Sequence, residues 1–125
     1  MAFIIAIDDQ EEWRQLHEQV LSGAGHTVHA FADGRTVLRS VDARPDVIVL
    51  DLRMYPTGRQ LLGSLRRKWR GVPIVICSAY DGFRDDPDFH DVAAFVAKSS
   101  DGGELLRAVQ SALAPGVAAS GDCEP

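Results

Sequence analysis

Short apolar runs alternate with longer amphipathic stretches along this chain, and this alternation constrains the fold more than any other feature. Five runs are rich in Val, Ile, Phe and Ala without strict polar alternation: Phe3–Ile7, Thr27–Phe31, Val47–Leu50, Ile74–Cys77 and Ala93–Ala97. Such runs are typical of strands covered on both faces, and strands separated by helices join through crossovers into a parallel sheet. We therefore predict an α/β fold in which all runs but the second are interior strands.

Amphipathic helices are predicted in the intervals between the strands. Apolar residues recur at helical spacing in three intervals and after the last strand: Glu11–Ser22, Gly34–Val41, Arg59–Trp69 and a segment that begins at Gly103. The interval from Asp81 to Asp91 is different, because Pro87 and five aspartates lie inside it. There we expect a short or irregular helix.

The size and composition of the chain fit one domain. The 125 residues are 46% hydrophobic and 25% charged, which is close to the globular average. We expect the domain to cover residues 1–114 and residues 115–125 to form a disordered tail without a core to join. The net charge of −5 disfavours nonspecific binding to nucleic acid as the main function.

The sequence also bounds the location of the protein. Its apolar runs are far shorter than the roughly 18 residues that span a membrane, and the first residues lack the basic segment of a secretory signal. Two cysteines, Cys77 and Cys123, make a disulfide framework improbable. We therefore expect a cytoplasmic protein with no membrane partner.

Chemically capable side chains follow the predicted interior strands. Asp8 and Asp9 follow the first strand, Asp51 the third, Ser78 the fourth and Lys98 the fifth. The carboxyl ends of parallel strands meet at one edge of a sheet, and in the flavodoxin-like order 2-1-3-4-5 the first and third strands are neighbours at the ligand-binding switch point. The three carboxylates are therefore predicted to lie close together.

A divalent cation would relieve the repulsion in such a cluster. Two negative charges about 4 Å apart repel by about 4 kcal/mol at an effective dielectric constant near 20. Carboxylate and water oxygens suit Mg²⁺, which commonly brings a phosphate oxygen into its coordination sphere. Lys98, one of only two lysines, could pair with the carboxylates or with a phosphoryl group, and the Ser78 hydroxyl could hydrogen-bond the same oxygens.

These residues resemble the response-regulator receiver domain of two-component signalling. The segments Ile-Asp-Asp, Val-Ile-Val-Leu-Asp-Leu-Arg-Met, Ser-Ala-Tyr and Phe-Val-Ala-Lys arrive in the order of that family, within residues 3–114. The resemblance implies a flavodoxin-like (βα)5 sandwich around a five-stranded parallel sheet in the order 2-1-3-4-5.

The resemblance also implies a phosphoryl-transfer site. It implies that Asp51 accepts a phosphoryl group from the phosphohistidine of a sensor histidine kinase or a histidine phosphotransfer protein. Asp8 and Asp9 would then bind Mg²⁺ together with Asp51 and the backbone carbonyl of Arg53, and Lys98 would pair with the phosphate. Apart from this self-catalysed transfer and autodephosphorylation, we expect no conventional enzyme activity.

The remaining implied roles concern the output. Ser78 would swing toward the phosphate and Phe95 would be the aromatic rotamer switch, which couples charge to the shape of the surface that an unknown downstream protein contacts. Bulky side chains at Arg53 and Tyr80 predict slow hydrolysis of the phosphorylated aspartate.

Several positions depart from the family pattern. Tyr55 occupies the position, four residues after Asp51, where proline is usual, and Ser99 replaces the proline after Lys98, which predicts a trans peptide. These changes, with Pro87, keep a second hypothesis open, namely a receiver fold that acts as a phosphorylation-independent interaction module. A phosphatase or a flavin protein is a weaker alternative, because the chain lacks an aspartate two positions after Asp51 and a phosphate-binding loop after the first strand.

The remaining polar side chains carry simpler interpretations. The histidines lack metal-ligand spacing, so we expect surface or packing roles for His17, His26, His29 and His90. The cationic residues 66–70 are expected to be a solvated helix end, with a nucleic-acid or partner patch around Trp69 as the minor alternative.

Overall fold

Five parallel strands form a single sheet at the centre of the protein. The computed structural model describes residues 2–51, 57–78, 92–98 and 102–113. The strands are β1 (Phe3–Ile7), β2 (Thr27–Phe31), β3 (Val47–Leu50), β4 (Ile74–Ser78) and β5 (Ala94–Ala97). They pair in the order β2-β1-β3-β4-β5 with every pairing parallel, which confirms the predicted flavodoxin-like sheet.

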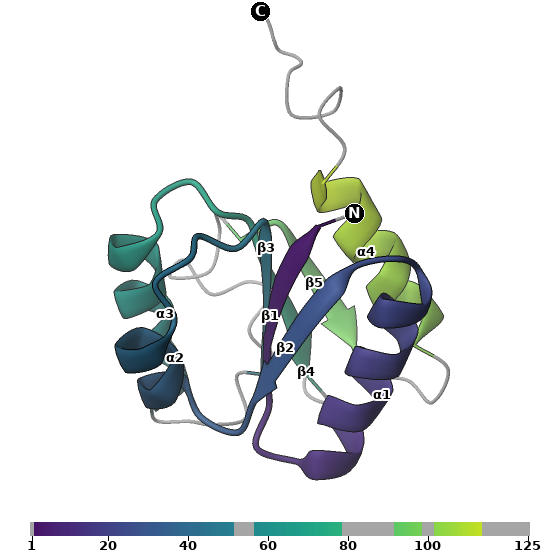
Figure 1. Cartoon of the computed structure of the whole chain (residues 1–125), viewed down its shortest axis with the longest axis horizontal. Helices are drawn as coiled ribbons and strands as arrows, with labels where there is room; N and C mark the ends of the chain where they lie inside the picture. The colour runs from purple at the N-terminus through teal and green to yellow at the C-terminus, as the bar shows by residue number, and fades with distance from the viewer. Residues whose placement is uncertain (1, 52–56, 79–91, 99–101, 114–125) are drawn as a thin grey trace, which may run out of the picture.

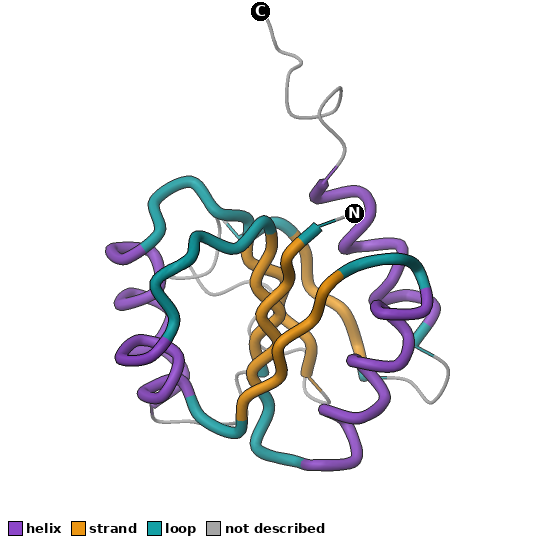
Figure 2. Tube along the Cα trace, in the orientation of Figure 1, coloured by secondary structure: helices purple, strands orange, loops and turns teal. Residues whose placement is uncertain are grey.

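Two layers of helices cover the sheet. The described helices are α1 (Glu11–Gly23), α2 (Gly34–Ser40), α3 (Thr57–Lys68) and α4 (Gly103–Leu113). Helices α1 and α4 lie on one face, and α2 and α3 lie on the other (Figure 1). The colouring in Figure 2 shows the same three layers, with the strands between the two helical pairs. The predicted helices in these intervals are confirmed within one or two residues at their ends.

One expectation about the sheet was wrong. We expected β5 to be interior, but the strand order places it at the edge opposite β2. Ala94 and Phe95 are accordingly only half-buried, whereas every residue of β3 and β4 is buried. An apolar composition alone does not distinguish a central strand from an edge strand that a helix covers on one face.

Each face of the sheet has its own hydrophobic core. Ile5, Ile7, Ile48 and Leu50 point toward α2 and α3, where they pack with Leu65 and other apolar residues. The alternate residues of the same strands pack against α1 and α4 in the second core. Because side chains on a strand alternate between faces, strands buried on both sides are apolar at successive positions. The two cores together fix the register of the strands and so the positions of the residues that follow them.

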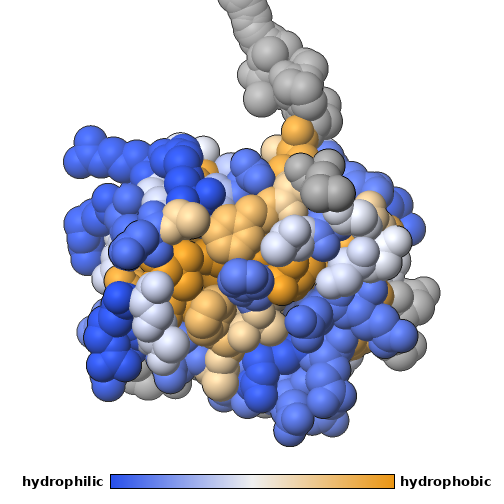
Figure 3. Space-filling view, in the orientation of Figure 1, coloured by the Kyte–Doolittle hydropathy of each residue, from blue (hydrophilic) through white to orange (hydrophobic). Residues whose placement is uncertain are grey.

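The surface around the open edge of the sheet is mixed. In Figure 3 apolar atoms gather in the middle of the face that looks onto β2, with hydrophilic side chains on both flanks. Partly buried Phe3, Phe31 and Val41 pack against the core on that side. No helix in the described part of the chain is long and apolar enough to cross a membrane.

Two sequence predictions fall outside the described residues. The short or irregular helix predicted within Asp81–Asp91 and the tail predicted at 115–125 both lie there. The domain boundaries at 1–114 therefore stay a prediction.

Candidate functional site

Two buried aspartates end neighbouring strands at the carboxyl edge of the sheet. Asp8 follows β1 and Asp51 follows β3, and the last residues of these strands, Ile7 and Leu50, are paired in the register. The Asp51 N–H donates to the Ile7 carbonyl at 3.0 Å, and the Asp8 N–H donates to the Phe31 carbonyl at 3.0 Å. Each aspartate is only 1% exposed. The backbone ladder thus holds both carboxylates side by side and away from bulk water.

A third carboxylate completes the cluster. One oxygen atom each of Asp8, Asp9 and Asp51 lies within 4.8 Å of the other two, and Asp9 is the exposed member. The Asp8 Oδ1 atom accepts a hydrogen bond from the Gln10 N–H at 2.9 Å, whereas its Oδ2 atom is buried and accepts no hydrogen bond of good geometry. Three converging carboxylates have the donor chemistry of a Mg²⁺ site.

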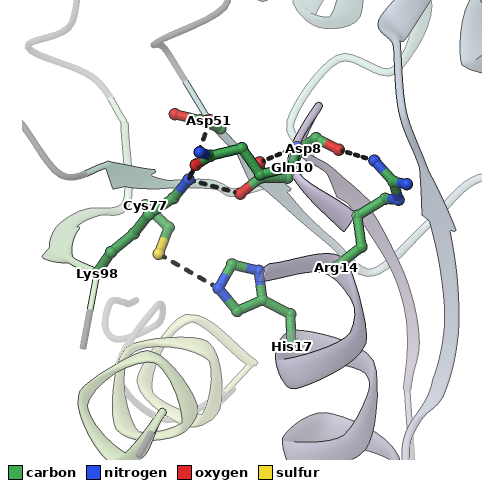
Figure 4. A network of polar contacts seen from close by, with 7 residues as sticks. All are labelled: Asp8, Gln10, Arg14, His17, Asp51, Cys77 and Lys98. Carbon is green, nitrogen blue, oxygen red and sulfur yellow. Dashed lines mark hydrogen bonds and ion pairs between the residues drawn. The ribbon is translucent and has the colours of Figure 1, made fainter. Parts of the chain in front are cut away.

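The ammonium of Lys98 contacts the two buried members of this cluster, Asp8 and Asp51 (Figure 4). Its Nζ atom is 2.8 Å from Asp8 Oδ2 and 3.1 Å from Asp51 Oδ2, and these side chains are almost fully buried. The same ammonium donates to Gln10 Oε1 at 3.1 Å. One cation among three carboxylates leaves an excess of negative charge, so the cluster still attracts a further cation.

Ser78 and Phe95 lie near this edge on the next two strands. Ser78 is the buried last residue of β4, and its carbonyl accepts the Lys98 N–H at 3.1 Å. Phe95 pairs with Ile76 in the register between β4 and β5, and its half-buried side chain packs against the core below α2 and α3. The structure therefore places Asp8, Asp9, Asp51, Ser78 and Lys98 at one edge of the sheet, and Phe95 beside it.

The sequence interpretation missed residues that contact Lys98 from helix α1. Besides Gln10, the Trp13 ring lies against the ammonium, with 5.2 Å between Nζ and the ring centroid. Gln10 directly follows Asp9, and Trp13 and His17 come three and then four residues later, a spacing that places the three side chains on one face of a helix. The helical spacing directly after the acid pair is therefore the sequence signal that could have identified Gln10 and Trp13 as neighbours of the site.

A buried polar pair lies below the lysine. His17 is 3% exposed, and its Nε2 atom is 3.6 Å from the sulfur of Cys77, although 60 positions separate the two residues. Burial, and then the charge of Lys98, lowers the pKa of His17 to about 4. Burial raises the pKa of the Cys77 thiol to about 12. Near neutral pH both side chains are therefore uncharged, and the thiol is a poor nucleophile.

Five sequence predictions lie outside the described residues. They concern the backbone carbonyl of Arg53, the bulk of Tyr80, and the altered positions Tyr55, Pro87 and Ser99. The Arg53 ligand and the two positions expected to slow hydrolysis therefore stay predictions.

Comparison with known proteins identifies close similarities. A family model described as "Response regulator receiver domain" matches residues 4–110. The alkaline phosphatase synthesis transcriptional regulatory protein SphR of Synechococcus elongatus is 38% identical over 90 residues, which are 62% of this chain and 35% of that protein. The chain spans about a third or less of the length of the first curated relatives that it matches.

Solved structures show the same fold. The response regulator TrrA of Thermotoga maritima, in complex with Mg²⁺ and BeF, is 26% identical, with a TM-score of 0.82 over 90% of this chain and 100% of that one. TrrA in complex with the histidine kinase ThkA matches with a TM-score of 0.80 and 26% identity over 91% of this chain and 100% of that one.

Proposed function

Because the chain belongs to the response regulator receiver domain family of two-component systems, we propose that Asp51 accepts a phosphoryl group from a phosphohistidine. The donor would be a sensor histidine kinase or a histidine phosphotransfer protein. One observation carries this proposal: Asp51 Oδ2 lies 3.1 Å from the Lys98 ammonium, beside the buried Asp8 carboxylate, at one edge of the sheet. Two neighbours support it, since TrrA is described in complex with Mg²⁺ and BeF and with a histidine kinase.

The chain supplies a nucleophile and a counter-charge for the transfer. An Asp51 oxygen forms the new bond to phosphorus, the bond from phosphorus to the imidazole nitrogen breaks, and that nitrogen leaves with the bonding electron pair. A carboxylate needs no general base to attack. The Lys98 ammonium, 3.1 Å from Asp51 Oδ2, would bind the incoming phosphoryl oxygens and hold them in line with Asp51.

Asp8, Asp9 and Asp51 would hold the magnesium ion, with the backbone carbonyl of Arg53 as a further ligand. The fit rests on the donor set, in which three carboxylates converge and two of them are buried. When bound, Mg²⁺ supplies positive charge that neutralises the phosphoryl oxygens. The fold requires no change for this, because the backbone ladder already places the two buried carboxylates together.

The proposed output is a protein contact that depends on phosphorylation. Ser78 would hydrogen-bond the added oxygens, and Phe95 would turn inward, so that the surface around β4 and β5 changes. The bulk of Arg53 and Tyr80 would slow attack by water on the acyl phosphate. We also propose a cytoplasmic location, which the free thiol of Cys77 supports, because cysteines are typically reduced in that compartment.

Intact-mass measurement after incubation with acetyl phosphate and Mg²⁺ tests the proposal. The expected result is one added phosphoryl group on the wild-type chain and none on Asp51→Asn. Asp42→Asn, which removes an exposed carboxylate far from β3's carboxyl end, is the matched control and should be labelled like the wild type. Equal labelling of Asp51→Asn, or no labelling of the wild type, would contradict the proposal.

The second hypothesis, a phosphorylation-independent interaction module, makes a different prediction. It was motivated by Tyr55, Pro87 and Ser99, which lie outside the described residues. A partner that binds the wild type and Asp51→Asn equally, with or without acetyl phosphate, would favour it over the phosphoacceptor.

A further inference from the structure

Lys98 pairs with two of the three carboxylates that the proposed magnesium site needs. Its ammonium is 2.8 Å from Asp8 Oδ2 and 3.1 Å from Asp51 Oδ2. A divalent cation that binds these two oxygens would meet a positive charge at van der Waals distance, and like charges this close repel strongly. The ammonium must therefore give up part of its contact with the carboxylates and be held by other groups.

We propose that Gln10 and Trp13 are positioning residues that hold the Lys98 ammonium when a divalent cation binds Asp8 and Asp51. This inference rests on the proposed function, because it assumes the cation site described above. It assigns a role to two side chains that follow the acid pair, one just before helix α1 and one in its first turn. Neither side chain is proposed to bind the cation or the phosphoryl group.

The geometry of both contacts fits this role. Gln10 Oε1 accepts a hydrogen bond from the ammonium at 3.1 Å, and the Trp13 ring centroid is 5.2 Å from Nζ, within the range of a cation–π interaction. Figure 4 shows the amide of Gln10 beside the Lys98 ammonium and the two carboxylates. Both partners are neutral. They therefore stabilise the ammonium without adding a negative charge that could itself attract the metal.

Among the described residues, the Gln10 side chain hydrogen-bonds to Lys98 and does not cap helix α1. Gln10 is the residue before helix α1, but its side chain makes no capping hydrogen bond to the first turn. The helix begins instead with two acidic residues, Glu11 and Glu12, which favour the positive end of the helix dipole. The amide is therefore available to bind Lys98, and its substitution removes no helix cap.

Trp13 is held in place from below. The ring of His17 lies 6.1 Å from the Trp13 ring, centroid to centroid, and His17 in turn contacts the Cys77 sulfur at 3.6 Å. Because burial keeps His17 neutral near pH 7, it adds no positive charge beside Lys98. Because His17 and Cys77 are both uncharged, this buried pair is compatible with the nearby Lys98 ammonium.

The two neutral partners matter more when the cation is bound. Without the cation, Lys98 has two carboxylates as well as Gln10 and Trp13, so the loss of one neutral partner is partly compensated. With the cation bound, the carboxylates interact with both the cation and Lys98. The neutral partners then contribute a larger share of the stabilisation of the ammonium. Loss of either one therefore weakens cation binding, by about fivefold if one hydrogen bond or cation–π contact is lost.

Lysine-selective NMR during a Mg²⁺ titration tests this inference directly. The chain has only two lysines, and each lies over a tryptophan: Lys98 over Trp13 and Lys68 over Trp69, at 5.2 and 5.1 Å. In the wild type, the Lys98 side-chain signal should keep the ring-current shift caused by the Trp13 ring until the protein is saturated with Mg²⁺. Lys68, on the far side of the domain, is the internal control for the fold and should not respond.

The variants Gln10→Leu and Trp13→Leu should each bind Mg²⁺ about fivefold more weakly, as measured by calorimetry. Trp13→Phe, which keeps a smaller aromatic face, should recover part of the affinity, and Gln19→Leu, an exposed glutamine on the same helix, should bind like the wild type. An unchanged Lys68 signal shows that each variant is folded.

Two results would overturn the inference and leave the proposed function standing. The first is wild-type Mg²⁺ affinity in both Gln10→Leu and Trp13→Leu. The second is loss of the Trp13 ring-current shift from the Lys98 signal on saturation. Failure of the wild type to bind Mg²⁺ at all would be a different outcome, because it would remove the cation site of the proposed function and this inference with it.

Discussion

The two lysines of this chain, one at the end of α3 and one after β5, make similar contacts and meet very different electrostatics. Lys68 ends α3, donates to the Leu38 carbonyl at 2.8 Å, and lies 5.1 Å from the centroid of the Trp69 ring. Lys98 follows β5, lies 5.2 Å from the centroid of Trp13, and forms ion pairs with two carboxylates. Only the second ammonium is buried among charges.

The difference teaches which feature makes a lysine part of a site. A cation at a helix end near a backbone carbonyl is favourable but replaceable, because water can take over its hydrogen bonds. A buried ammonium between buried carboxylates is not replaceable in this way, since each charge left alone would be costly to desolvate. The contact with an aromatic ring, which both lysines share, does not separate the two cases.

The comparison predicts its largest effect for Lys98→Met. Removal of this ammonium takes its ion pairs away from the buried Asp8 and Asp51 carboxylates, so the free energy of unfolding in metal-free buffer should fall by about 3 kcal/mol. Urea denaturation at pH 7 measures this value. A loss below about 1 kcal/mol would show that the two lysines are energetically alike.

The next effect concerns the buried histidine below Lys98. The pKa of His17 is lowered from 6.5 to about 4, so between these values the unfolded chain binds a proton that the folded chain does not. Stability from this group is therefore present above pH 6.5 and is lost as the pH falls toward 4, by up to about 1.4 kcal/mol per pH unit.

Substitution of His17 isolates this contribution. The difference in unfolding free energy between the wild type and His17→Leu should shift steadily against the wild type as the pH falls from about 6.5 to about 4. His29→Leu, at an exposed position on the edge strand β2, is the matched control for loss of an imidazole. Parallel stability curves for the wild type and His17→Leu would contradict the burial of a neutral imidazole.

A smaller effect of opposite sign is expected for Asp9→Asn. This exposed carboxylate repels the two buried ones, so its removal should raise the free energy of unfolding in metal-free buffer by about 1 kcal/mol or less, and added salt should reduce the gain. Asp42→Asn, an exposed aspartate after α2, is the control. A loss of stability in Asp9→Asn would mean that the carboxylates do not repel one another.

The smallest effect is expected at the other lysine. Lys68→Met removes a hydrogen bond to the Leu38 carbonyl and a cation–π contact near the surface, and should cost about 0.5 kcal/mol. Urea denaturation under the conditions used for Lys98→Met provides the comparison. If Lys68→Met lowers the free energy of unfolding as much as Lys98→Met does, the buried ion pairs do not distinguish the two lysines.

The sequence predicted the meeting of the acids and Lys98 for a simple geometric reason. Asp8, Asp51 and Lys98 each follow an apolar run, and parallel strands bring their carboxyl ends to one edge whatever the loops do. The same reasoning placed Ser78 there. Strand direction and residue type are enough to predict these features, and no knowledge of side-chain packing is needed.

Other features depend on packing that a linear pattern does not report. The contact between His17 and Cys77 joins positions 60 residues apart, and only the packing of α1 against the sheet brings them together. Trp13 looked like one more apolar residue of an amphipathic helix, although its ring lies against the site lysine. The edge position of β5 was missed because helix cover on one face keeps an edge strand apolar.

A crystal soaked in Mn²⁺, a hard cation with the oxygen preference of Mg²⁺, tests the central claim most directly. The account predicts one strong anomalous peak bound by the carboxylates of Asp8, Asp9 and Asp51, with the Lys98 ammonium still beside Gln10 and Trp13. No peak at these carboxylates, or a peak at the opposite edge of the sheet, would contradict it.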